Sequence, residues 1–205
     1  MTDLFDDAAT LQAVPMPDAD VRFARGFYRP PTSTALLRTL LDETAWRQER
    51  IIVWNQERLQ PRLSAWYGDA GSRYTYSGRA FHPLAWTPTL LRMKAEVETA
   101  TGERYNSVLL NLYRDGEDSV SWHSDGEPEL GPAPAIASVS LGETRVFRFR
   151  HRQDKALRPV SIALEDGSLL LMRGSTQRCW QHAIMKEKRV CGPRINLTFR
   201  QIRQG

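Results

Sequence analysis

The sequence of 205 residues is poor in cysteine and histidine, with only two and four of them. Two cysteines are too few for a disulfide scaffold, so we expect a reducing compartment. No apolar run approaches the roughly 18 residues of a membrane-spanning helix, and the first residues lack the basic and apolar regions of a signal peptide. We therefore expect no membrane association and no secretion: the protein would be cytoplasmic and nucleoid-associated, or nuclear if the source is eukaryotic.

Basic residues are absent from the first 20 residues, which carry five aspartates. Taking these five from the 24 acidic residues leaves 19 against 28 basic ones, a net charge of +9 over residues 21–205. Such a surplus favours a polyanionic partner, nucleic acid first, although a soluble protein with a basic surface has the same composition. We expect an acidic flexible leader over residues 1–20 and a single domain over residues 21–205.

Helical periodicity is limited to two segments, and the remaining chain has the pattern of short strands. Regularly spaced leucines predict one helix within residues 31–46, and Thr87, Pro88 and Gly102 frame a second one. Strands are expected at 51–54, 62–66, 74–77, 107–113, 136–141, 144–150, 160–164, 168–172, 178–183 and 194–202. This pattern predicts a mainly β fold, a β-sandwich or jelly roll with helices packed on one sheet.

A turn-rich acidic segment places His123 two residues before Asp125. A turn explains part of this pattern, because Asp-Gly pairs tolerate positive φ, but His-x-Asp can also aim an imidazole and a carboxylate at one cation. His182 lies on a predicted strand and is the best second imidazole, whereas His151 is expected to be solvated and His82 to lie in a loop. Two histidines and one carboxylate with open positions form the usual non-haem Fe(II) oxygenase site.

A polar strand face follows close behind in the sequence. Period 2 places four polar side chains on one face of residues 194–200, namely those of Arg194, Asn196, Thr198 and Arg200. The two arginines would be about 20 Å apart along the strand, and their long side chains can lean inward as two guanidinium forks for one small dicarboxylate. Alternatively, they face solvent or nucleic acid.

Together these motifs resemble the AlkB family of Fe(II)- and 2-oxoglutarate-dependent nucleic-acid dealkylases. The likeness covers about residues 50–202 in family order, through "WYGDAGSRYTYSG", "NSVLLNLYRDGEDSVSWHSD", "AIASVSLGETRVFRFRH", "GSLLLMRGSTQRCWQH" and "RINLTFR". Within the family, the double-strand DNA repair branch of the human homologue 2 type is the most similar. The resemblance implies a double-stranded β-helix, or jelly roll, as catalytic core over about residues 105–202, with an N-terminal lid and finger region for nucleic-acid recognition over about residues 50–80.

The resemblance also implies the residues of the site. The implied Fe(II) ligands, which are also the catalytic residues, are His123, Asp125 and His182. The implied contacts of 2-oxoglutarate are Asn111, Tyr113, Arg194, Asn196, Thr198 and Arg200, with Arg194 at the distal carboxylate. The implied substrate contacts are Val53, Trp54 and Asn55 in the finger, Arg62 beside it, Tyr74, Tyr76 and Ser77 in the lid, and Glu127 at the exocyclic amine of the damaged base.

Two positions depart from the branch pattern. Trp54 is bulkier than the expected finger residue, and Gly126 stands where the branch usually has a second acid. The electrostatics on the substrate side would therefore rest on Glu127, whose carboxylate would attract a cationic methylated base.

The function that this resemblance implies is oxidative demethylation of N-alkylated bases in DNA, such as 1-methyladenine and 3-methylcytosine. Fe(II) would be the cofactor, with 2-oxoglutarate and O₂ as co-substrates and formaldehyde as a product, and the enzyme would act as a monomer on double- or single-stranded DNA. The alternatives are an RNA demethylase of the same family, a small-molecule 2-oxoglutarate oxygenase and a non-catalytic nucleic-acid-binding β-domain. A structural zinc site at Cys179, His182 and Cys191 is a further alternative, because Cys-x-x-His is a zinc-like spacing.

Overall fold

The larger of two facing sheets has seven antiparallel strands. The structure is a computed structural model, and it describes residues 10–53, 56–71, 74–76, 79–81, 83–189 and 191–203. In order across the sheet, the strands are β1 (Gln12–Ala13), β2 (Asp20–Ala24), β13 (Ser168–Arg173), β10 (Ile136–Gly142), β15 (Arg194–Arg200), β8 (Ser107–Tyr113) and β5 (Leu63–Gly68). The middle strands are buried almost throughout, because both faces of this sheet are covered.

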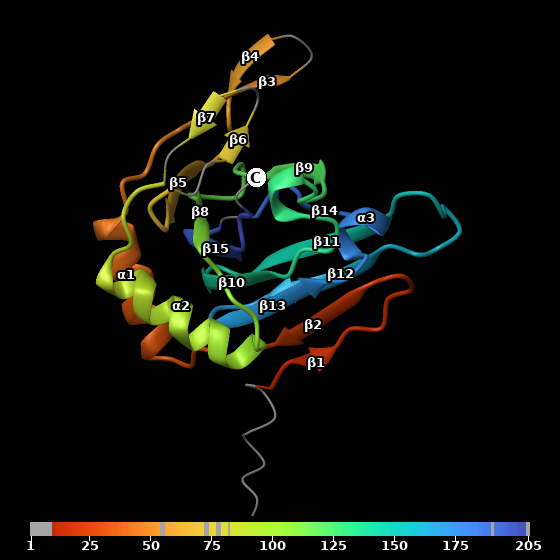
Figure 1. Cartoon of the computed structure of the whole chain (residues 1–205), viewed down its shortest axis with the longest axis horizontal. Helices are drawn as coiled ribbons and strands as arrows, with labels where there is room; N and C mark the ends of the chain where they lie inside the picture. The colour runs from red at the N-terminus through yellow and green to blue at the C-terminus, as the bar shows by residue number, and fades with distance from the viewer. Residues whose placement is uncertain are drawn as a thin grey trace, which may run out of the picture.

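The smaller sheet has four antiparallel strands that lie over one face of the larger sheet (Figure 1). Its order is β12 (Val160–Leu164), β11 (Arg145–His151), β14 (Trp180–Ile184) and β9 (Val120–His123). Phe147 and Phe149 of β11 point inward and pack with Leu170 and Met172 of β13, so one hydrophobic core fills the space between the sheets. The two sheets form the sandwich that the strand pattern predicts.

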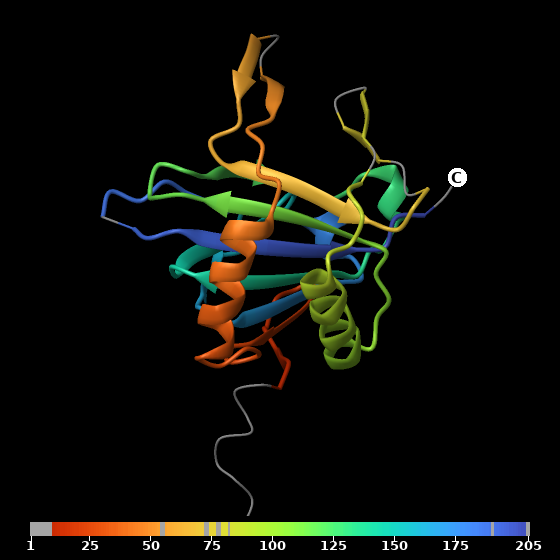
Figure 2. The ribbon, with the colours of Figure 1, turned by 90° about the vertical axis from the view of Figure 1, so that its left-hand side faces the viewer.

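Two helices cover the other face of the larger sheet, α1 (Thr32–Glu43) and α2 (Pro88–Thr101), as Figure 2 shows. The stripe of Leu36 and Leu40 on α1 and of Leu90 and Met93 on α2 packs into a second core against β8, β10 and β15. Thr87 caps α2, because its side chain accepts a hydrogen bond from the backbone N–H of Leu90. The prediction of two helices packed on one sheet is confirmed.

Two short hairpins project from the sandwich beyond the edge of the larger sheet (Figures 1 and 2). They consist of β3 (Arg50–Val53) with β4 (Gln56–Leu59), and of β6 (Tyr74–Tyr76) with β7 (Arg79–Phe81). Both belong to the segment predicted as finger and lid. The described residues contain no helix that is long and apolar enough to cross a membrane.

Several segments differ from the sequence prediction. Residues 178–183 were expected as one strand, but the chain first forms the helical turn α3 (Thr176–Cys179) and only then enters β14. In this turn, the N–H groups of Arg178 and Cys179 both donate to the carbonyl of Ser175. Five strands were not predicted, namely β1, β2, β4, β7 and β9. β1 and the buried Met16 lie within residues 10–20, so this part of the predicted flexible leader is packed against the sheet. The division of the chain at residue 20 stays a prediction.

The prediction that His151 is solvated is wrong. His151 is the last residue of β11, where the alternation that buries Phe147 and Phe149 also turns it inward. Its ring packs edge-on against Trp180 at 5.1 Å, and its Nδ1 accepts a hydrogen bond from the backbone N–H of Asp154. His82 lies outside the described residues.

Candidate active site

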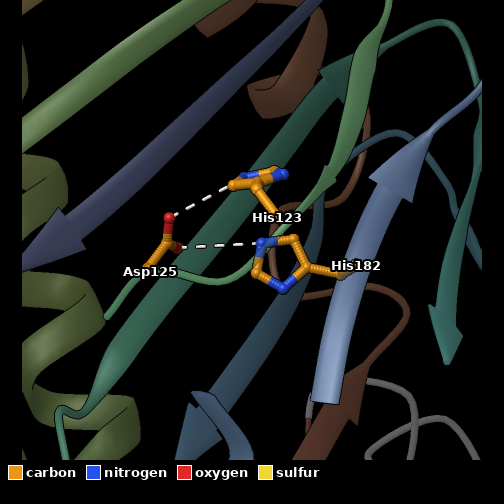
Figure 3. A group of neighbouring side chains, drawn as sticks. All are labelled: His123, Asp125 and His182. Atoms are coloured by element: carbon orange, nitrogen blue, oxygen red, sulfur yellow. Dashed lines mark ion pairs between the residues drawn. The ribbon is translucent and has the colours of Figure 1, made fainter. Parts of the chain in front are cut away.

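His123, Asp125 and His182 converge between the two sheets (Figure 3). His123 ends β9 and is the register partner of His182 on the neighbouring β14, while Asp125 follows two residues beyond the strand. The Nε2 atom of His123 lies 3.8 Å from Oδ1 of Asp125, and that of His182 lies 3.9 Å from Oδ2. One potential ligand atom from each residue lies within 4.8 Å of the others. Two neighbouring antiparallel strands therefore bring His182 to His123 and Asp125, which lie far from it in the sequence.

The protonation states of this group suit a divalent cation. Nδ1 of His123 lies 2.8 Å from the carbonyl oxygen of Ser121, which can only accept, so Nδ1 is the donor and Nε2 is the nitrogen that faces Asp125. Burial lowers the pKa of His182 to about 3, so its imidazole is neutral. Burial opposes ionisation of Asp125, but the guanidinium of Arg200 outweighs it, and the pKa of Asp125 is lowered to about 2.

Two imidazoles and one carboxylate are the donor set of a facial non-haem Fe(II) site. Among the described residues, this is the one group of three or more such side chains whose atoms are close enough to hold a metal ion. Cys179 and Cys191 do not belong to it, so the structure does not bring together the ligands of the zinc alternative. The ring of Phe147 lies nearly parallel to that of His182 at 4.9 Å and orients an imidazole whose Nδ1 has no hydrogen-bond partner among the described residues.

A cavity of about 260 Å³ opens beside the three side chains. It is lined by all three of them and by every residue that the resemblance assigned to 2-oxoglutarate, namely Asn111, Tyr113, Arg194, Asn196, Thr198 and Arg200. The polar side chains of β15 face this cavity, while Ile195, Leu197 and Phe199 enter the core under the helices. The predicted polar face of β15 is therefore confirmed as a face, and it points into the protein rather than to solvent.

At one end of the cavity, Arg194 is a buried cation without a carboxylate. Its side chain is 1% exposed; Nη2 donates to Oγ of Ser140 at 2.9 Å, and the guanidinium lies 5.0 Å from the centre of the Tyr113 ring. Nε and Nη1 are buried and have no hydrogen-bond partner within the described part of the chain. Burial lowers the pKa of Arg194 to about 10. These unmatched donors fit a bound carboxylate, which would satisfy both of them.

At the other end, Arg200 pairs with the metal-site carboxylate. Its Nη2 lies 3.0 Å from Oδ1 of Asp125, and both side chains are buried. Sequence reasoning assigned Arg200 only to the cosubstrate pocket and missed this pairing. Asp125 follows a strand of the smaller sheet and Arg200 ends a strand of the larger one, so they meet only because the two sheets pack face to face.

Arg145 is a further buried arginine that sequence reasoning missed. Its guanidinium donates to the backbone carbonyls of Asp115, Asp118 and Met185, pairs with Glu187 at 3.2 Å, and lies 5.7 Å from the centre of the Tyr113 ring. It thereby joins two loops behind the Arg194 end of the cavity. The signal in the sequence was an arginine at an inward position of β11.

The predicted substrate residues are only partly described. Glu127 lines the cavity, as does Arg62, whose Nε donates to Oδ1 of Asn111 at 2.8 Å, so Arg62 contacts a predicted 2-oxoglutarate residue. Arg62 also donates to the carbonyl of Ser119 at 3.3 Å. Trp54, Asn55 and Ser77 lie outside the described residues, and of Val53, Tyr74 and Tyr76 only the backbone in β3 and β6 is described. Their roles stay predictions.

Comparisons with known proteins agree with this geometry. The family model of the 2OG-Fe(II) oxygenase superfamily matches residues 20–200. Alpha-ketoglutarate-dependent dioxygenase alkB homolog 3 of Bos taurus is 43% identical over 185 residues, which cover 86% of this chain and 64% of the relative. DNA oxidative demethylase ALKBH2 of Homo sapiens is also 43% identical, over 159 residues that cover 75% of this chain and 61% of the relative.

The chain thus spans slightly less than two thirds of the length of these relatives, and equal identities do not separate the homologue 2 type from homologue 3. The predicted branch therefore stays a prediction. A solved structure described as "The structure of OsALKBH1" superposes with a TM-score of 0.65 at 16% identity, over 94% of this chain and all of that one. At that identity the likeness supports the jelly-roll fold alone.

Proposed function

This chain belongs to the 2OG-Fe(II) oxygenase superfamily and, by its relatives, to the AlkB family, and on that premise we propose that it oxidatively demethylates N-alkylated bases in DNA. The proposed substrates are bases such as 1-methyladenine and 3-methylcytosine. One observation carries the proposal: a His/Asp/His ligand set and an arginine without a carboxylate line the same cavity. The His/Asp/His end of the cavity would accept a metal, and the Arg194 end would accept a dicarboxylate.

His123, Asp125 and His182 would hold Fe(II), which together with 2-oxoglutarate and O₂ supplies the oxidation of an N-methyl group that is then lost as formaldehyde. The other residues bind and orient. Arg194 would pair with the far carboxylate of 2-oxoglutarate and so direct its 2-oxo acid end toward the three ligands. Arg62 holds Oδ1 of Asn111, which fixes the orientation of the Asn111 amide at the cavity wall.

Glu127 would favour the damaged base over the intact one. Glu127 lines the cavity, and its carboxylate there would attract a methylated base that carries a positive charge. A base that cannot pair normally is also less costly to extrude from a duplex. The two projecting hairpins would act as finger and lid, and the positive charge of residues 21–205 favours the polyanionic substrate.

DNA is the proposed substrate because one group of relatives is named for DNA oxidative demethylation, and the protein would act as a monomer wherever its DNA lies, in the nucleoid or the nucleus. RNA demethylation is the second candidate, since neither the ligand set nor the cavity distinguishes the deoxyribose of DNA from the ribose of RNA. The convergence of two imidazoles and an ionised carboxylate in one cavity argues against a non-catalytic β-domain.

Formaldehyde release tests the proposal. Oligonucleotides with 1-methyladenine or 3-methylcytosine, as single- and double-stranded DNA and as RNA, would be incubated with the chain, Fe(II) and 2-oxoglutarate. We expect formaldehyde and succinate in equal amounts from DNA, and none without Fe(II) or with the His182→Ala variant. Larger yields from RNA would select the second candidate. Succinate formation that no methylated nucleic acid stimulates would instead indicate a small-molecule oxygenase.

A further inference from the structure

The backbone of Asp125 is held by a side chain from a distant turn. Gln177 lies in α3, is 3% exposed, and its Oε1 accepts a hydrogen bond from the backbone N–H of Asp125 at 3.0 Å across 52 residues of sequence. Its Nε2 contacts Sδ of Met172 at 3.5 Å. Gln177 does not line the cavity and is not one of the three ligands. Any influence on a metal would therefore pass through Asp125.

Asp125 needs such support because regular structure ends before it. β9 stops at His123, and the ladder between β9 and β14 shifts register in this region. The next residue, Gly126, is exposed, and a Cβ there would meet nothing nearer than Oγ of Ser124 at 4.0 Å. No packing therefore holds the chain at Gly126. The hydrogen bond to Gln177 fixes the backbone of Asp125, while Arg200 contacts its carboxylate.

The turn that carries Gln177 is itself anchored. Oγ1 of Thr176 accepts a hydrogen bond from the backbone N–H of Asp20 at 3.1 Å, and Oγ of Ser175 donates to the carbonyl of Asp18 at 2.8 Å. The indole of Trp180, just after the turn, donates to the carbonyl of Pro17 at 2.8 Å. Residues 17–20 thus clamp α3 from the outside, and Gln177 projects from a fixed point.

From these contacts we propose that Gln177 is a positioning residue of the metal centre, which sets Asp125 in place before a metal binds. The proposal rests on the metal site of the proposed function, and it extends that site to a residue outside the cavity. Partners of metal ligands contribute about 10- to 100-fold in metal affinity, because they remove the cost of ordering the ligand.

The test compares three variants by calorimetric titration with Mn(II), a redox-inert substitute for Fe(II), without cosubstrate or nucleic acid. Gln177→Met keeps the size of the side chain but loses the acceptor. Gln177→Glu keeps an acceptor oxygen for the N–H of Asp125 but loses the amide donor. Gln181→Met is the matched control: Gln181 lies four residues away, and its Oε1 accepts hydrogen bonds from the exposed side chain of Arg150.

We expect Gln177→Met to weaken Mn(II) binding by about 10-fold or more, Gln177→Glu to restore most of the affinity, and Gln181→Met to bind like the wild type. An unchanged Mn(II) Kd in Gln177→Met would overturn the proposal, as would equal losses in the Met and Glu variants. If Gln177→Met fails to fold, Gln177→Glu alone decides: it should bind within a few-fold of the wild type, and a tenfold loss would refute the role of the acceptor. Wild-type chain that binds no Mn(II) would overturn the proposed function as well.

Discussion

The two ends of β15 carry the same residue in opposite surroundings. Arg194 and Arg200 lie on one face of one strand and line one cavity, yet Arg200 pairs with Asp125 at 3.0 Å whereas Arg194 has no carboxylate within ion-pair distance in the described residues. The buried charge of Arg200 has its partner in Asp125, so this pair is part of the structure that supports the metal centre. A buried charge without a partner costs several kcal/mol in the folded chain and indicates a ligand that brings the counter-charge.

The largest effect is expected when the metal end of the cavity loses a ligand. We expect His182→Ala to abolish both Mn(II) binding at micromolar concentration and formaldehyde release, because two ligands do not define a facial site. The fold should survive, since the change removes a buried side chain without leaving a charge. Circular dichroism and calorimetric titration would check both statements. Retained turnover in His182→Ala would refute the ligand assignment.

Metal-free stability distinguishes the two arginines directly. Arg200→Met leaves the carboxylate of Asp125 buried without its partner, so we expect the free energy of unfolding to fall by about 3 kcal/mol and Mn(II) to restore part of it. Arg194→Met removes a charge that has no partner, so the free energy of unfolding should stay the same or rise. Urea unfolding without metal gives both values. Equal losses in the two variants would contradict the assignment of one arginine to the scaffold and the other to a ligand.

Acid should destabilise the metal-free protein through the metal end. The pKa of His182 is lowered from 6.5 to about 3 by burial, so between these values the unfolded chain binds more protons than the folded chain. The free energy of unfolding should therefore fall as the pH drops from about 6.5 toward 3, by about 1 kcal/mol per unit. Asp125, with its pKa lowered to about 2, adds a loss in the same direction below pH 4. A His182→Leu variant should show a shallower slope, and an equal slope would contradict a buried neutral imidazole.

The smallest expected effect lies at the substrate side. Glu127→Gln keeps the shape of the side chain but removes its charge, so turnover of 1-methyladenine and 3-methylcytosine should fall a few-fold more than turnover of a neutral lesion such as 1-methylguanine. Decarboxylation of 2-oxoglutarate without DNA should be nearly unchanged. Equal losses on cationic and neutral lesions would mean that Glu127 does not act through its charge.

The sequence predicted what short periodicities encode: the polar face of β15, the stripes of α1 and α2, and the pairing of His123 with Asp125. It failed where contacts join distant segments. Nothing local predicts that Asp125 takes its counter-charge from Arg200 or its backbone support from Gln177, or that Arg62 reaches Asn111. His151 was misplaced because its basic neighbours suggested solvent, although the alternation along β11 turns it inward.

We propose a cavity that binds a metal at one end and, at the other, uses the Arg194 cation to bind a carboxylate ligand. A calorimetric titration of 2-oxoglutarate into the Mn(II)-loaded chain tests this most directly. Arg194→Ala should weaken binding by about 100-fold, and Arg194→Lys should recover only part, because it offers a point charge instead of a fork. The control Arg148→Ala changes an exposed arginine of β11 and should bind like the wild type. Wild-type affinity in Arg194→Ala would contradict the account, because the buried guanidinium would then hold something other than the cosubstrate.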